Sequence, residues 1–223
     1  MATQPSQPKG RIKASYKWAI VILLVALIVA FRLVEQIGFD RRPSDRFIVK
    51  KIIDGDTVEL LGGDRLRLLS IDTPENGELF FDEACRFLEE LSLGKTARIE
   101  YAGRRRDKYG RLLGYLYIDS IFVNKAILEN GLGFLYLFED TELERPQIEE
   151  LFTAQRAAMQ ARVGIWSIER DQEDYYVAVN GSFRFHRPGC RYIDQLRPGH
   201  HRTFHSREEA LYKGLSPCRR CKP

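Results

Sequence analysis

The sequence predicts a mostly β chain with flanking helices, an α+β fold, divided into an N-terminal segment, a central barrel and a small C-terminal module. Three observations predict this organisation. An apolar run lies near the N-terminus, strand-like alternation follows from residue 46, and histidine and cysteine residues recur in pairs near the C-terminus. With 223 residues, 44% of them hydrophobic and 30% charged, the chain has room for one sizeable core and one small extra module.

Charge is distributed unevenly along the chain, whose formal net charge is +4. Residues 1–32 carry five cations and no acid, residues 33–174 carry 20 basic and 28 acidic residues, and residues 175–223 carry 10 basic and 3 acidic residues. The net charges of the three stretches are therefore +5, −8 and +7. The acidic middle stretch argues against bulk nucleic-acid binding by charge alone, whereas the tail is strongly basic for its size.

The N-terminal segment predicts a membrane anchor. Residues 1–17 are polar and basic, and the apolar run that follows spans 18–34 if Arg32 extends its charge toward the lipid head groups. This length lies between that of the apolar region of a signal peptide and that of a minimal membrane-spanning helix. The candidate cleavage sites are weak, so an uncleaved signal anchor is favoured over a cleaved signal peptide. The cations before the run would keep residues 1–17 cytoplasmic. The rest of the chain would then face outward from the cell membrane, or be secreted after cleavage.

Residues 35–45 are predicted to be a linker, and residues 46–168 a single domain. Apolar and polar residues alternate in five runs bounded by turn residues, which predicts strands. The predicted strands are 47–53, 58–60, 66–71, 97–101 and 112–118. Helical spacing of apolar residues predicts three helices, at 80–91, 123–130 and 146–163. The order β-β-β-α-β-β-α-α fits a five-stranded Greek-key barrel of the OB type with flanking helices.

Carboxylates in two of the barrel segments predict a cation site. Asp56 begins the second strand after a tight turn, and Asp72 and Glu75 end the third strand, where Pro74 turns the chain. In an antiparallel meander the end of the third strand lies beside the start of the second, so Asp56 and Asp72 can converge. Two carboxylates with a nearby carbonyl make an oxygen-only site, which suits calcium rather than zinc.

Arginine in the same strands predicts a phosphate contact. Arg67 alternates with Leu66 and Leu68, so its guanidinium points away from the core and can grip two phosphate oxygens. Taken singly, each motif has a simpler explanation: Asp-Gly-Asp is usually a turn, Asp-Thr-Pro-Glu often begins a helix, and the run 104–106 is a solvated charge run. The joint order and spacing of the motifs favour the functional interpretation.

Five motifs in this order resemble the staphylococcal nuclease (thermonuclease) family over residues 47–167. They are IIDGDTVEL, RLRLLSIDTPE, DKYGRLLGYLY, VNKAILENGL and GIWS. The resemblance implies a calcium site formed by the carboxylates of Asp56 and Asp72 and the carbonyl of Thr73, with Glu75 as general base on the attacking water. It also implies that Arg67 and Arg111 grip the phosphate. Further nucleotide contacts implied by the resemblance are Lys108, Tyr109 and Tyr136.

The function implied by this resemblance is a calcium-dependent nuclease acting on DNA and RNA, with a single-strand preference and 3′-phosphate products. The alternative is a nucleic-acid-binding module of the same fold that has lost catalysis, and a third possibility is a scaffold protein that uses the anchor and the tail. No protein partner is evident. Two departures bear on substrate contacts: the segment after Glu75 is short, and Phe138 stands where the family can carry a second tyrosine. Cys85 is interpreted as a buried core thiol.

The C-terminal stretch 175–223 predicts a small metal-binding module. His186 and Cys190 form one close pair and Cys218 and Cys221 another, which suits a structural zinc ion in a segment too short to bury much core. A disulfide, or neither arrangement, remains open, and His200, His201 or His205 can replace a ligand.

The module resembles the metal-binding domain at the N-terminus of the Ada DNA-repair protein, with His186 in place of the first cysteine. That departure removes any basis for expecting methyl-phosphate repair. The basic charge of the tail, interleaved with Phe183, Phe185 and Tyr192, suits holding a nucleic-acid strand near the barrel. A stability cap or a contact with anionic lipid is the alternative.

Overall fold

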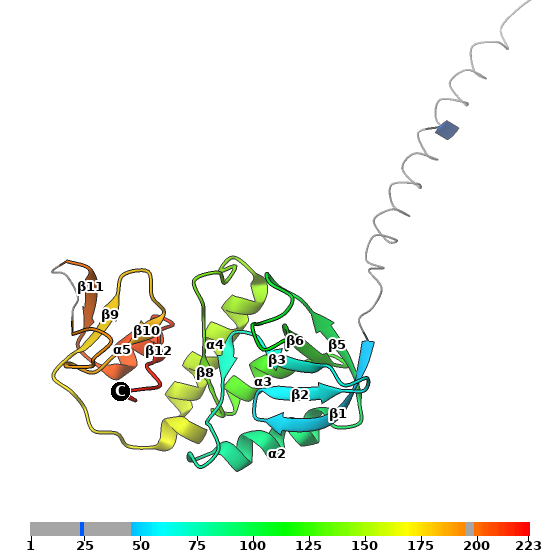
Figure 1. Cartoon of the computed structure of the whole chain (residues 1–223), viewed down its shortest axis with the longest axis horizontal. Coiled ribbons are helices and arrows are strands. Elements are labelled where there is room, and N and C mark those ends of the chain that lie inside the picture. The colour runs from blue at the N-terminus through cyan, green and yellow to red at the C-terminus, as the bar shows by residue number, and fades with distance from the viewer. Residues whose placement is uncertain (1–22, 25–45, 195–198) are drawn as a thin grey trace, which may run out of the picture. The chain divides into compact units, whose positions relative to one another are not determined.

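The computed structural model describes residues 23–24, 46–194 and 199–223 (Figure 1). The chain divides into two compact units, Met1–Ser44 and Asp45–Pro223. The predicted basic segment 1–17, the linker 35–45 and all of the predicted anchor except Leu23 and Leu24 lie outside the described residues. Among the residues that are described, no helix has the length and apolar character needed to cross a membrane.

Five strands form a closed barrel, which confirms the barrel predicted from the alternating pattern. They are β1 (Arg46–Asp54), β2 (Thr57–Leu60), β3 (Arg65–Leu68), β5 (Thr96–Glu100) and β6 (Leu112–Ile118). Antiparallel pairing joins β3 to β2, β2 to β1, β1 to β5 and β5 to β6, and a parallel pairing of β3 with β6 closes the ring. A short strand, β7 (Ile121–Phe122), extends the sheet beyond β6.

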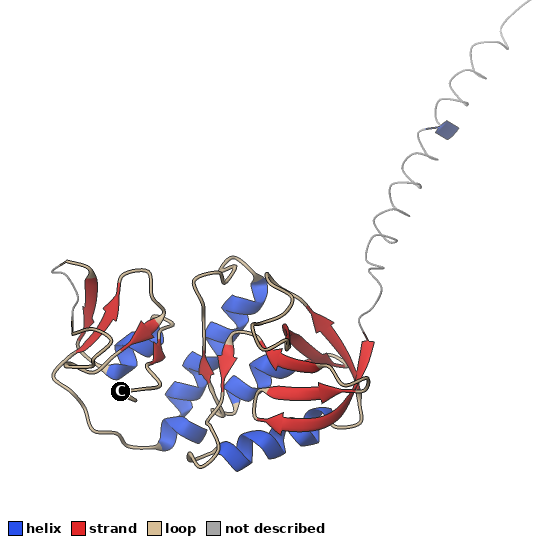
Figure 2. Ribbon diagram, viewed as in Figure 1, coloured by secondary structure: helices blue, strands red, loops and turns tan. Residues whose placement is uncertain are grey.

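Three helices and a 3-10 turn flank the barrel (Figure 2). They are α2 (Phe81–Ser92), α3 (Val123–Glu129), α4 (Pro146–Ala161) and η1 (Gly164–Ser167). Pro146 occupies the first turn of α4, where its missing N–H has no intrahelical acceptor to lose, and the left-handed Arg162 ends that helix. Fully buried side chains of the strands, such as Val58, Leu66 and Leu116, form one hydrophobic core with the apolar faces of the helices.

The third predicted strand, 66–71, is interrupted. Ser70 has a positive φ of 59°, and the chain continues as β4 (Ile71–Asp72), which pairs with β8 (Phe134–Leu135) rather than with β2. Two hydrogen bonds hold the break: the Ser70 hydroxyl lies 3.1 Å from the Tyr115 hydroxyl, and Asn124 donates to the Leu69 carbonyl at 2.8 Å. The break turns Asp72 out of the barrel wall.

The tail packs against the barrel domain within the second unit. Its elements are β9 (Tyr176–Val179), β10 (Arg184–Phe185), β11 (His201–Phe204), α5 (Arg207–Tyr212) and β12 (Ser216–Pro217). Its small core includes Tyr176, Phe185 and Leu211, and Phe134 and Trp166 of the barrel domain pack against that core. A buried hydrogen bond also joins the tail to the barrel domain: the hydroxyl of Ser216 donates to the carbonyl of Leu135 at 2.7 Å. The domain boundaries at 168 and 175 stay a prediction.

Candidate active site

The structure brings the two predicted cation ligands together. The Arg67 Nη2 atom lies 2.9 Å from Asp56 Oδ2 and 2.9 Å from Asp72 Oδ1, so one guanidinium bridges both carboxylates. The register of the barrel produces this geometry, because Thr57, which follows Asp56, lies opposite Arg67 in the β2–β3 pair. Asp54 accepts a hydrogen bond from the backbone N–H of Asp56 at 3.0 Å, which is the turn chemistry of an Asx motif.

Asp56 is held in a buried position by close packing. A Cβ atom on Gly55 would lie 2.6 Å from the Thr73 hydroxyl, so only glycine allows this approach, and the Thr73 N–H donates to Asp56 Oδ2 at 3.2 Å. Burial raises the pKa of Asp56 to about 7, against the lowering effect of Arg67, and the neighbouring carboxylates of Asp54 and Asp72 add to the rise. The cluster therefore carries a buried carboxylate whose charge its neighbours compensate only in part.

An arginine from the tail reaches the same cluster. Arg219 donates to both oxygens of Asp72, with Nε 3.2 Å from Oδ2, and its Nη1 lies 3.0 Å from Glu75 Oε1. Glu75, with 62% of its side chain exposed, is thus paired in this structure. Sequence reasoning missed Arg219, because it lies 147 residues from Asp72 and between two cysteines assigned to another site.

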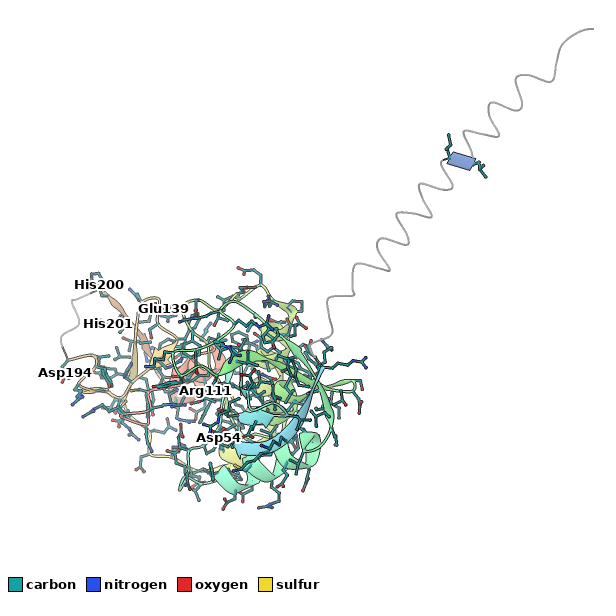
Figure 3. The ribbon with its side chains drawn as sticks, turned by 45° about the vertical axis from the view of Figure 1, so that its right-hand side comes forward. Asp54, Arg111, Glu139, Asp194, His200 and His201 are labelled. Carbon is teal, nitrogen blue, oxygen red and sulfur yellow. The ribbon has the colours of Figure 1, made fainter. Side chains whose placement is uncertain are left out.

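The remaining predicted site residues line one hollow of about 400 Å³ with Asp56, Arg67 and Glu75. They are Arg111, predicted to grip the phosphate, and the predicted nucleotide contacts Lys108, Tyr109 and Tyr136. Arg111 is oriented by Asp107, which accepts from its Nε at 2.8 Å and from its backbone N–H at 3.0 Å. Figure 3 labels Asp54 and Arg111, both of which belong to the lining of this hollow. Phe138, half-exposed, also lines it, edge-on to Tyr136 with the ring centroids 5.1 Å apart.

The four predicted ligands of the tail also converge. The ligand atoms of His186, Cys190, Cys218 and Cys221 all lie within 4.8 Å of one another, and the three cysteines among them are free thiols in the structure. Burial lowers the pKa of His186, with Arg184 adding to the effect, which favours the neutral imidazole that binds metals.

Other tail residues occupy different positions from those expected. His200, His201 and His205 are exposed and are not part of this cluster, and Figure 3 labels the first two. Phe185 is fully buried and Phe183 packs against the barrel core, so these two rings are structural and do not face a strand. Tyr192, the third predicted aromatic contact, is 60% exposed.

Cys85 of the barrel domain is half-buried on α2, where burial raises its pKa to about 11.

Comparison with known proteins gives consistent matches. Residues 65–168 match the family model described as "Staphylococcal nuclease homologue". An uncharacterized protein of Bacillus anthracis is 33% identical over 132 residues, which cover 54% of this chain and 60% of that protein. A thermonuclease of Staphylococcus intermedius is 28% identical over 162 residues, covering 66% and 95% of the two chains. An uncharacterized endonuclease of Escherichia coli O157:H7 is 32% identical over 123 residues, covering 53% and 75%.

Proposed function

The chain belongs to the staphylococcal nuclease family and is a nuclease, a hydrolase, and we propose that it is calcium-dependent and cuts the phosphodiester bonds of both DNA and RNA. The proposal includes a preference for single strands and products that carry 3′-phosphates. The observation that supports it most is the convergence of the Asp56 and Asp72 carboxylates on the guanidinium of Arg67, because it brings oxygen ligands suited to a hard cation together with a group suited to binding a phosphate.

The residues present fit a calcium ion. The raised pKa of Asp56 indicates a negative charge that burial destabilises and that a divalent cation would compensate. Asp56, Asp72 and the carbonyl of Thr73 would hold the ion, and all three offer the oxygen ligands that calcium prefers. When bound, calcium would stabilise charge on the phosphate and make a coordinated water more acidic.

The side chains around this position have distinct parts in the hydrolysis. Arg67 and Arg111 would bind the non-bridging oxygens of the phosphate, where negative charge increases as water attacks. Glu75 is accessible to solvent and would take the proton of that water as the new O–P bond forms. The bond from phosphorus to the 5′ oxygen then breaks, and that oxygen takes a proton from solvent.

The test is the release of acid-soluble nucleotides from single-stranded DNA and from RNA by the full chain. Calcium should support release, a calcium chelator should abolish it, and Glu75→Gln should lower it by at least about 10²-fold, the usual range for a lost general base. Glu83→Gln, at an exposed position of α2, is the matched control and should be neutral. Equal release under all of these conditions would contradict the proposal. Oligonucleotide binding without any cleavage would instead favour a non-catalytic binding module.

For the tail we propose a structural zinc ion held by His186, Cys190, Cys218 and Cys221. The convergence of one imidazole and three free thiols supports it, since two close pairs of N and S ligands suit tetrahedral zinc. Metal analysis of the full chain, purified under reducing conditions, should give about one zinc ion per chain. Clearly less than one, or a disulfide between Cys218 and Cys221, would contradict this assignment.

We also propose that the chain is held in the cell membrane by residues 18–34 with the nuclease domain on the extracytoplasmic side. The support is the apolar run and the cations that precede it. Sequencing the N-terminus of the mature protein separates an anchor from a cleaved signal. Digestion of the nuclease domain by protease added to intact cells checks its orientation; protection of the domain would refute it.

A further inference from the structure

A second hollow lies beside the one at the carboxylate cluster. It has a volume of about 530 Å³ and shares the lining residues Tyr136 and Arg219 with the first, so the two hollows adjoin at these side chains. The other residues of the second hollow, here called the tail hollow, all belong to the tail. They are Ser182, Arg184, His186, Tyr192, Cys218 and Arg220.

The tail hollow has the opposite charge character to the carboxylate cluster. Among the residues that the structure describes, three arginines line it, Arg184, Arg219 and Arg220, and no aspartate or glutamate does. Arg184 is fixed in place because its Nη1 donates to the Leu137 carbonyl at 3.0 Å and to the Ser216 hydroxyl at 3.1 Å. Such a lining favours an anion, whereas the domain that carries the barrel is acidic as a whole.

Two aromatic rings line this hollow, those of Tyr136 and Tyr192. The guanidinium of Arg184 lies 3.4 Å from the centroid of the Tyr136 ring, which lines both hollows, and so holds that ring in place. Tyr192 is mostly exposed, with the guanidiniums of Arg191 and Arg220 at 5.7 Å and 5.9 Å from its ring centroid. Exposed rings beside guanidiniums are the arrangement with which proteins bind single-stranded nucleic acid without sequence preference.

We propose that the tail hollow is a second subsite for the nucleic-acid strand, in which Tyr192 stacks on a base and Arg220 binds a backbone phosphate beyond the one that is cut. The inference rests on the proposed nuclease function and deepens it, since it extends the substrate from the barrel onto the tail. The strand, rather than an anionic lipid, is the favoured ligand because the tail hollow adjoins, at Tyr136 and Arg219, the hollow where the strand would be cut.

The experiment compares a long and a short oligothymidylate, of about 12 and about 3 nucleotides. The short oligomer is smaller than the site size of a single OB-type barrel. The full chain, in mild detergent with its zinc retained, carries Glu75→Gln so that the oligomers stay intact during binding. Tyr192→Ala with Arg220→Ala is the test variant, and Lys213→Ala, an exposed cation of the tail outside the hollow, is the matched control. Fluorescence anisotropy gives the dissociation constants, and zinc content and Tm confirm that the variants are folded.

We expect the double substitution to weaken binding of the long oligomer at least about tenfold, from the loss of one stacked base and one phosphate contact, and to leave the short oligomer within about twofold. With Glu75 intact, the KM for the long oligomer should rise by a similar factor while kcat stays unchanged. No change for either oligomer, or an equal loss for both, overturns the proposal. Loss of binding to anionic lipid vesicles without loss of oligomer binding also overturns it.

Failure of the proposed nuclease function can be distinguished from failure of the proposed tail subsite. If the wild-type chain releases no nucleotides with calcium but the length-dependent loss of binding is still seen, the nuclease proposal fails and the tail subsite stands. If cleavage is normal and the loss does not depend on length, the tail subsite fails and the nuclease proposal stands.

Discussion

Replacing Asp56 by asparagine should stabilise the protein in the absence of calcium while removing its response to calcium. The folded-state pKa of Asp56, about 7, lies above its ordinary value of 3.8. The contribution of Asp56 to the free energy of unfolding is therefore fully present below about pH 4, and it is lost as the pH rises through 7. The difference corresponds to roughly 4 kcal/mol at most, since each pH unit of pKa difference is worth about 1.4 kcal/mol.

Asparagine recovers only part of that energy. Asp56 accepts hydrogen bonds from the Thr57 hydroxyl and from the Thr73 N–H, and an amide offers only one oxygen to replace these two acceptors. We therefore expect a net gain of roughly 1–3 kcal/mol at pH 8. For a folded unit of this size the gain corresponds to an increase in Tm of about 3–9 °C.

Thermal unfolding of the full chain with a calcium-selective chelator, at pH 5 and at pH 8, measures the effect. The advantage of the variant should be large at pH 8 and should shrink at pH 5, where Asp56 of the folded wild type is protonated. Added calcium should raise the Tm of the wild type and leave that of the variant unchanged. A variant that is no more stable than wild type at pH 8, or whose advantage does not depend on pH, would refute this account of Asp56.

Three further substitutions give distinct expectations. Arg219→Ala should tighten calcium binding by roughly 2- to 5-fold, because a half-exposed guanidinium no longer competes for Asp72. Isothermal titration measures the affinity, and weaker binding would show that no such competition exists. Gly131→Ala should lower the free energy of unfolding, measured in urea, by roughly 2–4 kcal/mol. The backbone φ of Gly131 is +63°, and the new Cβ would lie 2.1 Å from the Val163 carbonyl oxygen. An unchanged midpoint of the urea unfolding curve would contradict this expectation. Cys221→Ser should remove the zinc and make the tail sensitive to limited proteolysis; a resistant tail that lacks zinc would show that its core suffices without metal.

The barrel could be predicted because each strand carries its own signal. Alternation of buried and exposed residues, seen in β5 as exposed Thr96, buried Ala97, exposed Arg98 and buried Ile99, specifies both the strand and the face that it buries. Asp56 and Asp72 could be placed together for the same reason, since antiparallel pairing fixes which strand ends meet. The break at Ser70 had no such signal, because its positive φ is held by contacts with distant Tyr115 and Asn124.

The tail was harder to interpret because a sequence gives the number of charged side chains but not which of them are exposed to solvent and which are buried. Part of its basic character serves the fold: Arg207 is 5% exposed and donates from Nε to the Pro223 carbonyl, and Arg184 is tied to Leu137 and Ser216. Phe185 is likewise a core residue rather than a stacking ring. Net charge and aromatic content therefore overstated the number of tail side chains that are available to bind a ligand.

The position of Arg219 links the two candidate metal sites through the chain itself. Cys218 precedes it and Cys221 follows two residues later, so any ion that fixes these thiolates also fixes the backbone from which Arg219 reaches Asp72 and Glu75. The candidate metal ligands of the tail and the carboxylates of the barrel are therefore connected through one side chain, that of Arg219. If zinc occupies the cluster in the tail, as proposed, it would also restrict the position of Arg219 beside Asp72.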